Sequence, residues 1–108
     1  MENLFVYGSL MPNGTNHVIL KKINGVWQKG FVLGEIKRIK LNNNEYPAII
    51  LNIDKDKKVF GYLFSSFALK YLWRKLDNFE GPNYKRKISQ VFLNNSRIVE
   101  ANIYCLNE

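Results

Sequence analysis

Cysteine and histidine are nearly absent from this 108-residue chain, which contains one of each, Cys105 and His17. A single cysteine excludes an internal disulfide and a cysteine-based zinc cluster, and a lone thiol suits a reducing compartment. His17 has no cysteine or paired carboxylate at ligand spacing, so we expect no metal site. Histidine-dependent catalysis would need this same residue, and Ser9 lacks the G-x-S-x-G context of a nucleophile elbow. The composition therefore disfavours metal, thiol and serine chemistry.

Long apolar runs and glycine-rich phosphate loops are also missing. No run approaches the roughly 18 residues of a membrane span, and neither G-x-x-x-x-G-K nor G-x-G-x-x-G occurs. Residues 1–7 carry no basic region and lead directly to Gly8, which is typical of a strand and not of a signal peptide. We expect a cytoplasmic protein that contacts no membrane and needs no nucleotide or other cofactor.

Acidic residues are scarce relative to basic ones, because nine Asp and Glu face sixteen Lys and Arg, for a net charge of +7. Such a balance can indicate a nucleic-acid partner. The basic residues, however, form small groups and no long run, which is more typical of a solvated surface. These groups are Lys21-Lys22, Lys37-Arg38, Lys57-Lys58, Arg74-Lys75 and Lys85-Arg86-Lys87. A nucleic-acid partner is therefore the less favoured interpretation.

Length and composition fit one domain that spans residues 1–108. Hydrophobic residues make up 46% and charged residues 23%, close to ordinary globular usage. Hydrophobic periodicity and turn residues then divide the chain into elements. The predicted elements are strands at 3–7, 26–41, 46–53, 59–64, 84–93 and 98–106, a short helix at 16–23 that Asn16 caps, and a longer helix that Ser65 or Ser66 caps and Gly81-Pro82 ends.

The order of these elements determines the expected fold class. One good helix late among many strands gives no regular strand–helix alternation, which disfavours a βαβ arrangement. Turn residues at 54–57 make 59–64 the hairpin partner of 46–53, and residues 94–96 join the last two strands. Two glycines inside 26–41 predict a bend or bulge there. We expect an α+β fold, a small mixed and mainly antiparallel β-barrel with one or two flanking helices.

The segment Tyr7-Gly8-Ser9-Leu10 is a candidate binding loop at the end of the first strand. Successive backbone N–H groups at such a turn can point into one concavity and hold an anion such as a carboxylate. Gly8 would let a ligand approach the backbone closely. Taken by itself, a Gly-Ser pair after a strand is more often just an ordinary turn.

The second candidate segment is the end of the longer helix, which carries Asp77 and Glu80. The helix macrodipole disfavours negative charge in a last turn. If Glu80 is also partly buried beside Phe79, both effects raise the pKa of its carboxyl group. A carboxyl group that titrates near neutral pH suits proton transfer. The competing interpretation is an exposed glutamate at a frayed helix end.

Motifs through nearly the whole chain add to these two segments. They are Phe5-Val6-Tyr7-Gly8-Ser9-Leu10, Asn16-His17 with Leu20, Gly34-Glu35, Tyr46-Pro47-Ala48-Ile49, Val59-Phe60-Gly61-Tyr62-Leu63, Leu76-Asp77-x-x-Glu80-Gly81 with Tyr84-x-Arg86, and Glu100-Ala101-Asn102-Ile103-Tyr104. In this order they resemble the gamma-glutamylcyclotransferase-like family, and among its members the small proteins close to gamma-glutamylamine cyclotransferases. The opening loop combined with Leu-Asp-x-x-Glu-Gly-x-x-Tyr-x-Arg is fairly specific.

The resemblance implies a small mixed barrel with a cavity beside the exit of the first strand. It implies that Glu80 is the catalytic residue and that the loop Tyr7, Gly8, Ser9 and Leu10 binds a gamma-glutamyl group, largely through backbone. The α-amine of the substrate would attack its own γ-carbonyl to give 5-oxoproline and a free amine, without a cofactor. Tyr84 and Arg86 would border the site or brace the Glu80 loop.

Two other functions remain open from the sequence. One is a binding module for a small carboxylate that uses the same cavity without turnover. The other is a basic nucleic-acid-binding domain, for which the charge of +7 is the argument. The leaving amine and the oligomeric state are not indicated by any motif.

Overall fold

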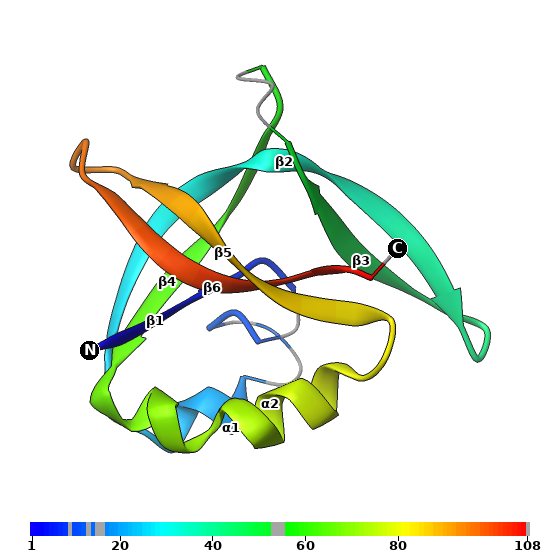
Figure 1. Ribbon diagram of the computed structural model, residues 1–108, viewed down its shortest axis with the longest axis horizontal. Helices are drawn as coiled ribbons and strands as arrows, with labels where there is room; N and C mark the ends of the chain where they lie inside the picture. The colour runs from blue at the N-terminus through cyan, green and yellow to red at the C-terminus, as the bar shows by residue number, and fades with distance from the viewer. Residues whose placement is uncertain (9, 13, 15–16, 53–55, 108) are drawn as a thin grey trace.

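The computed structural model describes residues 1–8, 10–12, 14, 17–52 and 56–107 of the chain. Within these residues, no helix combines the length and apolar content needed to cross a bilayer. Strands dominate, and the helices are short (Figure 1). In chain order the elements are β1 (Glu2–Val6), α1 (Val18–Lys21), β2 (Val26–Leu41), β3 (Asn44–Leu51), β4 (Lys58–Ser66), the 3₁₀ helix η1 (Phe67–Tyr71), α2 (Trp73–Glu80), β5 (Tyr84–Leu93) and β6 (Ile98–Leu106).

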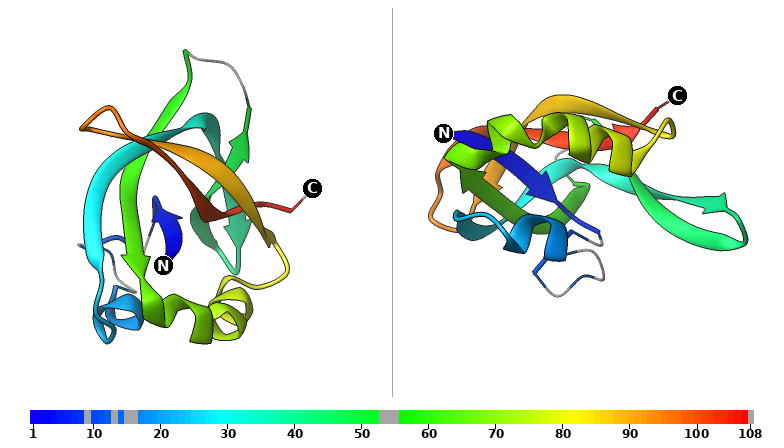
Figure 2. Two further views of the ribbon diagram at one scale, coloured as in Figure 1. Left: turned by 60° about the vertical axis from the view of Figure 1, so that its left-hand side comes forward. Right: turned by 90° about the horizontal axis from the view of Figure 1, so that it is seen from below.

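Five strands close into a barrel in the order β1, β4, β2, β5, β6. Four of the five pairings are antiparallel, and the closing pairing of β1 with β6 is parallel, with Leu4 opposite Asn102. β3 lies outside this ring, where it pairs with β2 and forms one parallel bridge to β6. Figure 1 and the left view of Figure 2 show the helices together on one side of the barrel. The expected mixed, mainly antiparallel barrel with flanking helices is confirmed.

Local turn signals predict several elements correctly. β2, β5 and β6 have the predicted bounds, and the turn between β5 and β6 is confirmed, since Ser96 has a φ of 69°. The short helix is confirmed as α1. Its predicted cap, Asn16, lies outside the described residues, as do residues 54 and 55 of the predicted turn before β4.

The predicted hairpin between β3 and β4 is wrong. In the described part of the chain, β4 pairs with β1 and β2. The long strand β2 pairs with two different strands: its residues 26–33 pair with β4, and its residues 34–41 pair with β3. The change of partner occurs at Gly34, where an added Cβ would lie 2.7 Å from the carbonyl oxygen of Ile50. Glycine therefore allows the close backbone approach at the point where β2 bends. The sequence predicted this bend, but a local pattern does not reveal which strand lies opposite each half.

The prediction of one longer helix before Gly81-Pro82 is also wrong, because the structure has two helices there. The Ser66 hydroxyl accepts a hydrogen bond from the N–H of Ala68 at 3.1 Å, which caps η1, and α2 begins separately at Trp73. Short 3₁₀ turns are frequent at the start of α-helices, where a chain leaves another element. Leu69 and Leu76 are fully buried, as the periodicity predicts, so the buried face continues across the break.

Two apolar clusters lie on opposite sides of β1. Phe5 belongs to the cluster inside the barrel, whereas Leu4 and Val6 pack in a second cluster with Leu76 of α2. This division follows from the alternation of side chains along a strand. β1 therefore serves both as barrel wall and as the platform for α2. Its exit lies where the barrel, α2 and β3 meet.

Candidate functional site

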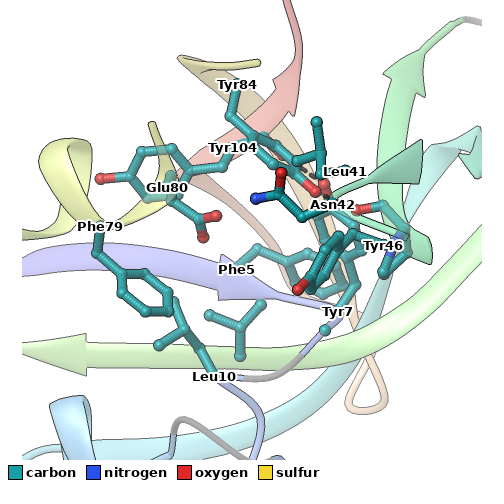
Figure 3. A pocket seen from close by; sticks show the side chains of 13 residues that line it. Phe5, Tyr7, Leu10, Leu41, Asn42, Tyr46, Phe79, Glu80, Tyr84 and Tyr104 are labelled. Atoms are coloured by element: carbon teal, nitrogen blue, oxygen red, sulfur yellow. Dashed lines mark hydrogen bonds between the residues drawn. The ribbon is translucent and has the colours of Figure 1, made fainter. Parts of the chain in front are cut away.

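A cavity of about 340 Å³ lies at the exit of β1. Its walls come from five parts of the chain: the end of β1 with the following loop, the β2–β3 hairpin, the end of α2, β5 and β6 (Figure 3). The lining is mainly apolar and aromatic, as is usual for small-molecule sites. The lining residues are Phe5, Val6, Tyr7, Gly8, Leu10, Leu41, Asn42, Tyr46, Pro47, Phe79, Glu80, Tyr84 and Tyr104.

Glu80 is the last residue of α2, and its carboxyl group points into the cavity (Figure 3). The helix stops there because Gly81 adopts a φ of 80°, a conformation that favours glycine, and its N–H bonds back to the carbonyl of Asp77 at 3.1 Å. Burial raises the pKa of Glu80 to about 7. The raised pKa predicted from the sequence is confirmed, with burial as its cause. At neutral pH this group can both accept and donate a proton.

Tyr7 fixes the exit of β1. Its hydroxyl donates a hydrogen bond to the carbonyl of Tyr104 at 2.5 Å and accepts one from the N–H of Ile49 at 3.1 Å. Burial raises the pKa of Tyr7, so the phenol stays neutral. One side chain thus ties the end of β1 to both β6 and β3.

The rest of the predicted binding loop lies beside Tyr7. Gly8 lines the cavity, and a Cβ added to it would lie 3.6 Å from Cγ of Pro47. Leu10 is buried, with 4% of its surface exposed, and Ser9 lies outside the described residues. The described loop residues and Glu80 border the same cavity. The roles of these residues in binding and catalysis stay predictions.

Tyr84 also lines the cavity, and its hydroxyl donates to the carbonyl of Pro47 at 2.8 Å. Burial raises the pKa of Tyr84, and the nearby charge of Glu80 adds to this effect. Because Tyr84 opens β5 and Pro47 lies in β3, this bond connects two strands across the site.

Arg86, the other predicted border residue, lies outside the cavity lining. Its guanidinium group forms two bonds to the Asp77 carboxylate, at 2.9 and 3.3 Å, donates to Asn102 at 3.2 Å and covers the ring of Trp73. Asp77 also accepts from the Tyr104 hydroxyl at 2.6 Å. Although partial burial raises the pKa of Asp77, the bonds from Tyr104 and Arg86 hold it below its usual value. Arg86 therefore braces α2 against β5 and β6, one turn before Glu80.

The β2–β3 hairpin was not predicted to reach the site, yet it brings Asn42, Tyr46 and Pro47 to the cavity. The hairpin had a local signal: Asn42 and Asn43 adopt φ values of 50° and 68°, and adjacent asparagines tolerate such turns. No local sequence signal indicated that the hairpin lies over the exit of β1, because that position depends on the bend of β2. Phe79, the neighbour of Glu80 in the sequence, also borders the cavity, and 41% of its surface is exposed.

Comparison with known proteins identifies the family. Residues 4–108 match the sequence profile of the family described as gamma-glutamyl cyclotransferase, AIG2-like. The chain is 33% identical to AIG2-like protein D of Arabidopsis thaliana over 96 residues, which is 89% of this chain and 60% of that relative.

Solved structures share the fold. YkqA from Bacillus subtilis matches 98% of this chain with a TM-score of 0.73 at 24% identity, although the chain spans only 36% of that protein. A yeast gamma-glutamyl cyclotransferase specific to glutathione matches 96% of this chain and 68% of its own length, with a TM-score of 0.71 at 10% identity. The profile match over nearly the whole chain shows that this protein belongs to the gamma-glutamyl cyclotransferase, AIG2-like family.

Proposed function

We propose that this protein is a gamma-glutamylcyclotransferase that converts a gamma-glutamyl amine, amino acid or peptide to 5-oxoproline and the free amine. Glu80 is the general acid/base. The observation that carries the proposal is a carboxyl group with a pKa of about 7 that points into a cavity at the exit of β1. Family membership and the structural likeness to the yeast gamma-glutamyl cyclotransferase support the same reaction class.

The cavity suits a flexible substrate that must fold onto itself. The attacking amine and the γ-carbonyl are tethered in one molecule, so the protein mainly has to hold a near-attack conformation, and correct orientation can contribute several kcal/mol. A volume of about 340 Å³ accommodates a glutamyl group in this ring-like conformation. The backbone at the described loop residues Tyr7, Gly8 and Leu10 holds the α-carboxylate.

Proton transfer then accounts for the role of Glu80. The α-nitrogen begins as an ammonium group and ends as a lactam N–H, so it loses two protons, and the departing nitrogen gains two. The ammonium first releases one proton to water. As the new C–N bond forms, the ionised Glu80 takes the second proton from the attacking nitrogen. It then donates this proton to the departing nitrogen as the old C–N bond breaks, while water supplies the other. Such positioned proton transfer contributes roughly 10²–10⁴ in rate.

The test is release of 5-oxoproline from a panel of gamma-glutamyl amines, amino acids and peptides. We expect release by the unaltered protein and its loss in Glu80→Gln. Glu100→Gln is the matched control, because Glu100 is exposed on β6 and lies outside the cavity lining. Failure of the unaltered protein on the whole panel would refute the proposal. Binding of 5-oxoproline without turnover would instead support a carboxylate-binding module.

A further inference from the structure

Most tyrosine hydroxyls in the cavity are already engaged with the protein. Tyr7 donates to the carbonyl of Tyr104, Tyr84 donates to the carbonyl of Pro47, and the Tyr104 hydroxyl donates to Asp77. These hydroxyls therefore serve to hold the walls of the cavity together. Donors for a substrate must come from the remaining polar groups of the lining.

Three described lining side chains keep a polar group without a protein hydrogen-bond partner within the part of the chain that the structure describes: Glu80, Asn42 and Tyr46. The described lining holds no Lys, Arg or His side chain. Negative charge that develops in this cavity therefore has to be stabilised by neutral donors. Asn42 provides two amide N–H donors, and Tyr46 provides one hydroxyl.

Asn42 occupies the first position of the two-residue turn between β2 and β3, where Leu41 pairs with Asn44. Its carboxamide points into the cavity toward Glu80, from the hairpin on the other side (Figure 3). The next residue, Asn43, has the same type of backbone conformation, with a φ of 68°, but does not line the cavity. The turn geometry explains asparagine at both positions, whereas the orientation toward Glu80 distinguishes Asn42.

The geometry of cyclisation indicates what such an amide can do. Glu80 must reach both the attacking and the departing nitrogen, so it lies on the side of the reacting carbon that carries these two nitrogens. The γ-carbonyl oxygen then points away from Glu80, toward the opposite wall. As the new C–N bond forms, the electron pair of the C=O bond moves onto this oxygen. It returns when the bond to the departing nitrogen breaks. Donors aimed at such an oxygen stabilise the transition state more than the bound substrate.

We propose that the Asn42 carboxamide donates a hydrogen bond to the γ-carbonyl oxygen and stabilises the oxyanion that forms on it. This inference rests on the proposed cyclotransferase function. It gives the β2–β3 hairpin a catalytic role and leaves the backbone of the Tyr7–Leu10 loop to hold the α-carboxylate. In the product, the same oxygen is the lactam carbonyl of 5-oxoproline, so the contact is also present in the product complex.

The turn offers a matched pair of variants. Asn42→Gly and Asn43→Gly both keep positive φ values, since glycine adopts them freely, and each removes one carboxamide. We expect Asn42→Gly to lower kcat by about 10- to 100-fold with a smaller change in KM, as for loss of an oxyanion donor. Asn43→Gly, which lies outside the cavity lining, should stay near the unaltered protein. Asn42→Asp keeps the turn but replaces the donor with an acceptor, so its kcat should fall at least as far.

A binding measurement separates this inference from the proposed function. With isotope-labelled protein, the side-chain amide resonances of Asn42, assigned by their absence in Asn42→Gly, should shift when 5-oxoproline is added, while those of Asn43 stay in place. Equal kcat values for Asn42→Gly and Asn43→Gly in an active protein would overturn the role of Asn42 and leave the proposed function standing. A protein that neither turns over gamma-glutamyl compounds nor binds 5-oxoproline would overturn both.

Discussion

Glu80 is a carboxyl group in an environment that disfavours its charge. It ends a helix, where the macrodipole opposes negative charge, and it faces a cavity whose described lining contains no cationic side chain. Burial dominates the resulting rise of its pKa to about 7. In the folded protein the group is therefore largely protonated at pH 5 and largely ionised at pH 9, whereas an unfolded glutamate ionises near its ordinary value of 4.5.

This difference predicts how Glu80→Gln changes stability. Between pH 4.5 and about 7 the folded state binds more protons than the unfolded state, so the contribution of Glu80 to the free energy of unfolding falls as pH rises. Gln carries no charge and avoids this loss. We expect Glu80→Gln to be more stable than the unaltered protein at pH 8, by about 1–3 kcal/mol, with the difference vanishing near pH 4.5. Urea unfolding at several pH values measures this difference in unfolding free energy between the two proteins. A difference that does not change with pH would contradict the burial of Glu80.

Tyr7 gives a second prediction at the scale of one residue. Tyr7→Phe keeps the ring but leaves the N–H of Ile49 and the carbonyl of Tyr104 without this partner. Loss of a buried partner costs about 1–3 kcal/mol. We expect a corresponding loss of unfolding free energy, together with faster hydrogen exchange at the Ile49 amide. Unchanged exchange there would show that the Tyr7 hydroxyl does not tie β1 to β3.

At the scale of elements, the last turn of α2 is held in place through Asp77. Asp77 accepts hydrogen bonds from Tyr104 and Arg86, and both partners come from the strands that α2 covers. The ion pair is partly exposed, with 43% of the Asp77 side chain accessible, so its charge contributes less than a buried pair would. Its main role is therefore geometric, because it fixes the helix end from which Glu80 projects.

Asp77→Ala should consequently affect catalysis more than stability. We expect a loss of about 1 kcal/mol in the free energy of unfolding and a clear drop in kcat/KM, because the end of α2 and with it Glu80 move. The pH midpoint of the remaining activity should stay near 7, since Glu80 remains the titrating group. A shift of the midpoint toward the ordinary value for glutamate would mean that Asp77 controls the burial of Glu80 as well.

The bounds of helices and strands were predictable where neighbouring residues in the sequence determine them. The bounds of β5 and β6 follow from alternation and from the Asn94-Asn95-Ser96 turn, and the end of α2 follows from Gly81. The pairing of β4 with β2 was not predictable, because it depends on a partner change at Gly34 that brings distant segments together. The break between η1 and α2 gave no signal either, since the buried positions keep their spacing across it.

At the scale of the whole molecule, closure of the barrel brings β4 into close contact with β1, at whose exit the cavity lies. An added Cβ on Gly61 of β4 would lie 2.2 Å from the carbonyl oxygen of Val6, a backbone atom that cannot move independently. Gly61→Ala would therefore push β4 away from β1 and open the barrel. We expect a loss of about 3 kcal/mol or more in the free energy of unfolding.

Gly8→Ala is the matched control for this prediction. Its new Cβ would make an ordinary contact, 3.6 Å from Pro47, so we expect stability close to that of the unaltered protein. Thermal or urea unfolding of both variants provides the comparison. Similar stability of Gly61→Ala and the unaltered protein would contradict the close packing of β1 on β4.

Only part of the cavity lining was predictable from sequence motifs. Glu80 and the Tyr7–Leu10 loop were predicted through motifs, and the described members of both border one cavity. Asn42 and Tyr46 were not predicted as cavity residues, because they reach it only through the bend of β2 and the position of β3 outside the barrel. Local chemistry indicated Glu80 as the proposed proton carrier, whereas the opposite wall is a property of the closed fold.

The most direct test of the proposed role of Glu80 is the pH dependence of kcat/KM for 5-oxoproline release, measured for the unaltered protein and for Glu80→Gln. Glu80 acts first as a base and must be ionised, so kcat/KM should fall as pH drops through about 7. Deprotonation of the substrate ammonium adds a rise at higher pH that belongs to the substrate and not to Glu80. Glu80→Gln should retain no such pH-dependent release. Release by Glu80→Gln with the same rate and the same midpoint would contradict the assignment of Glu80 as the proton carrier.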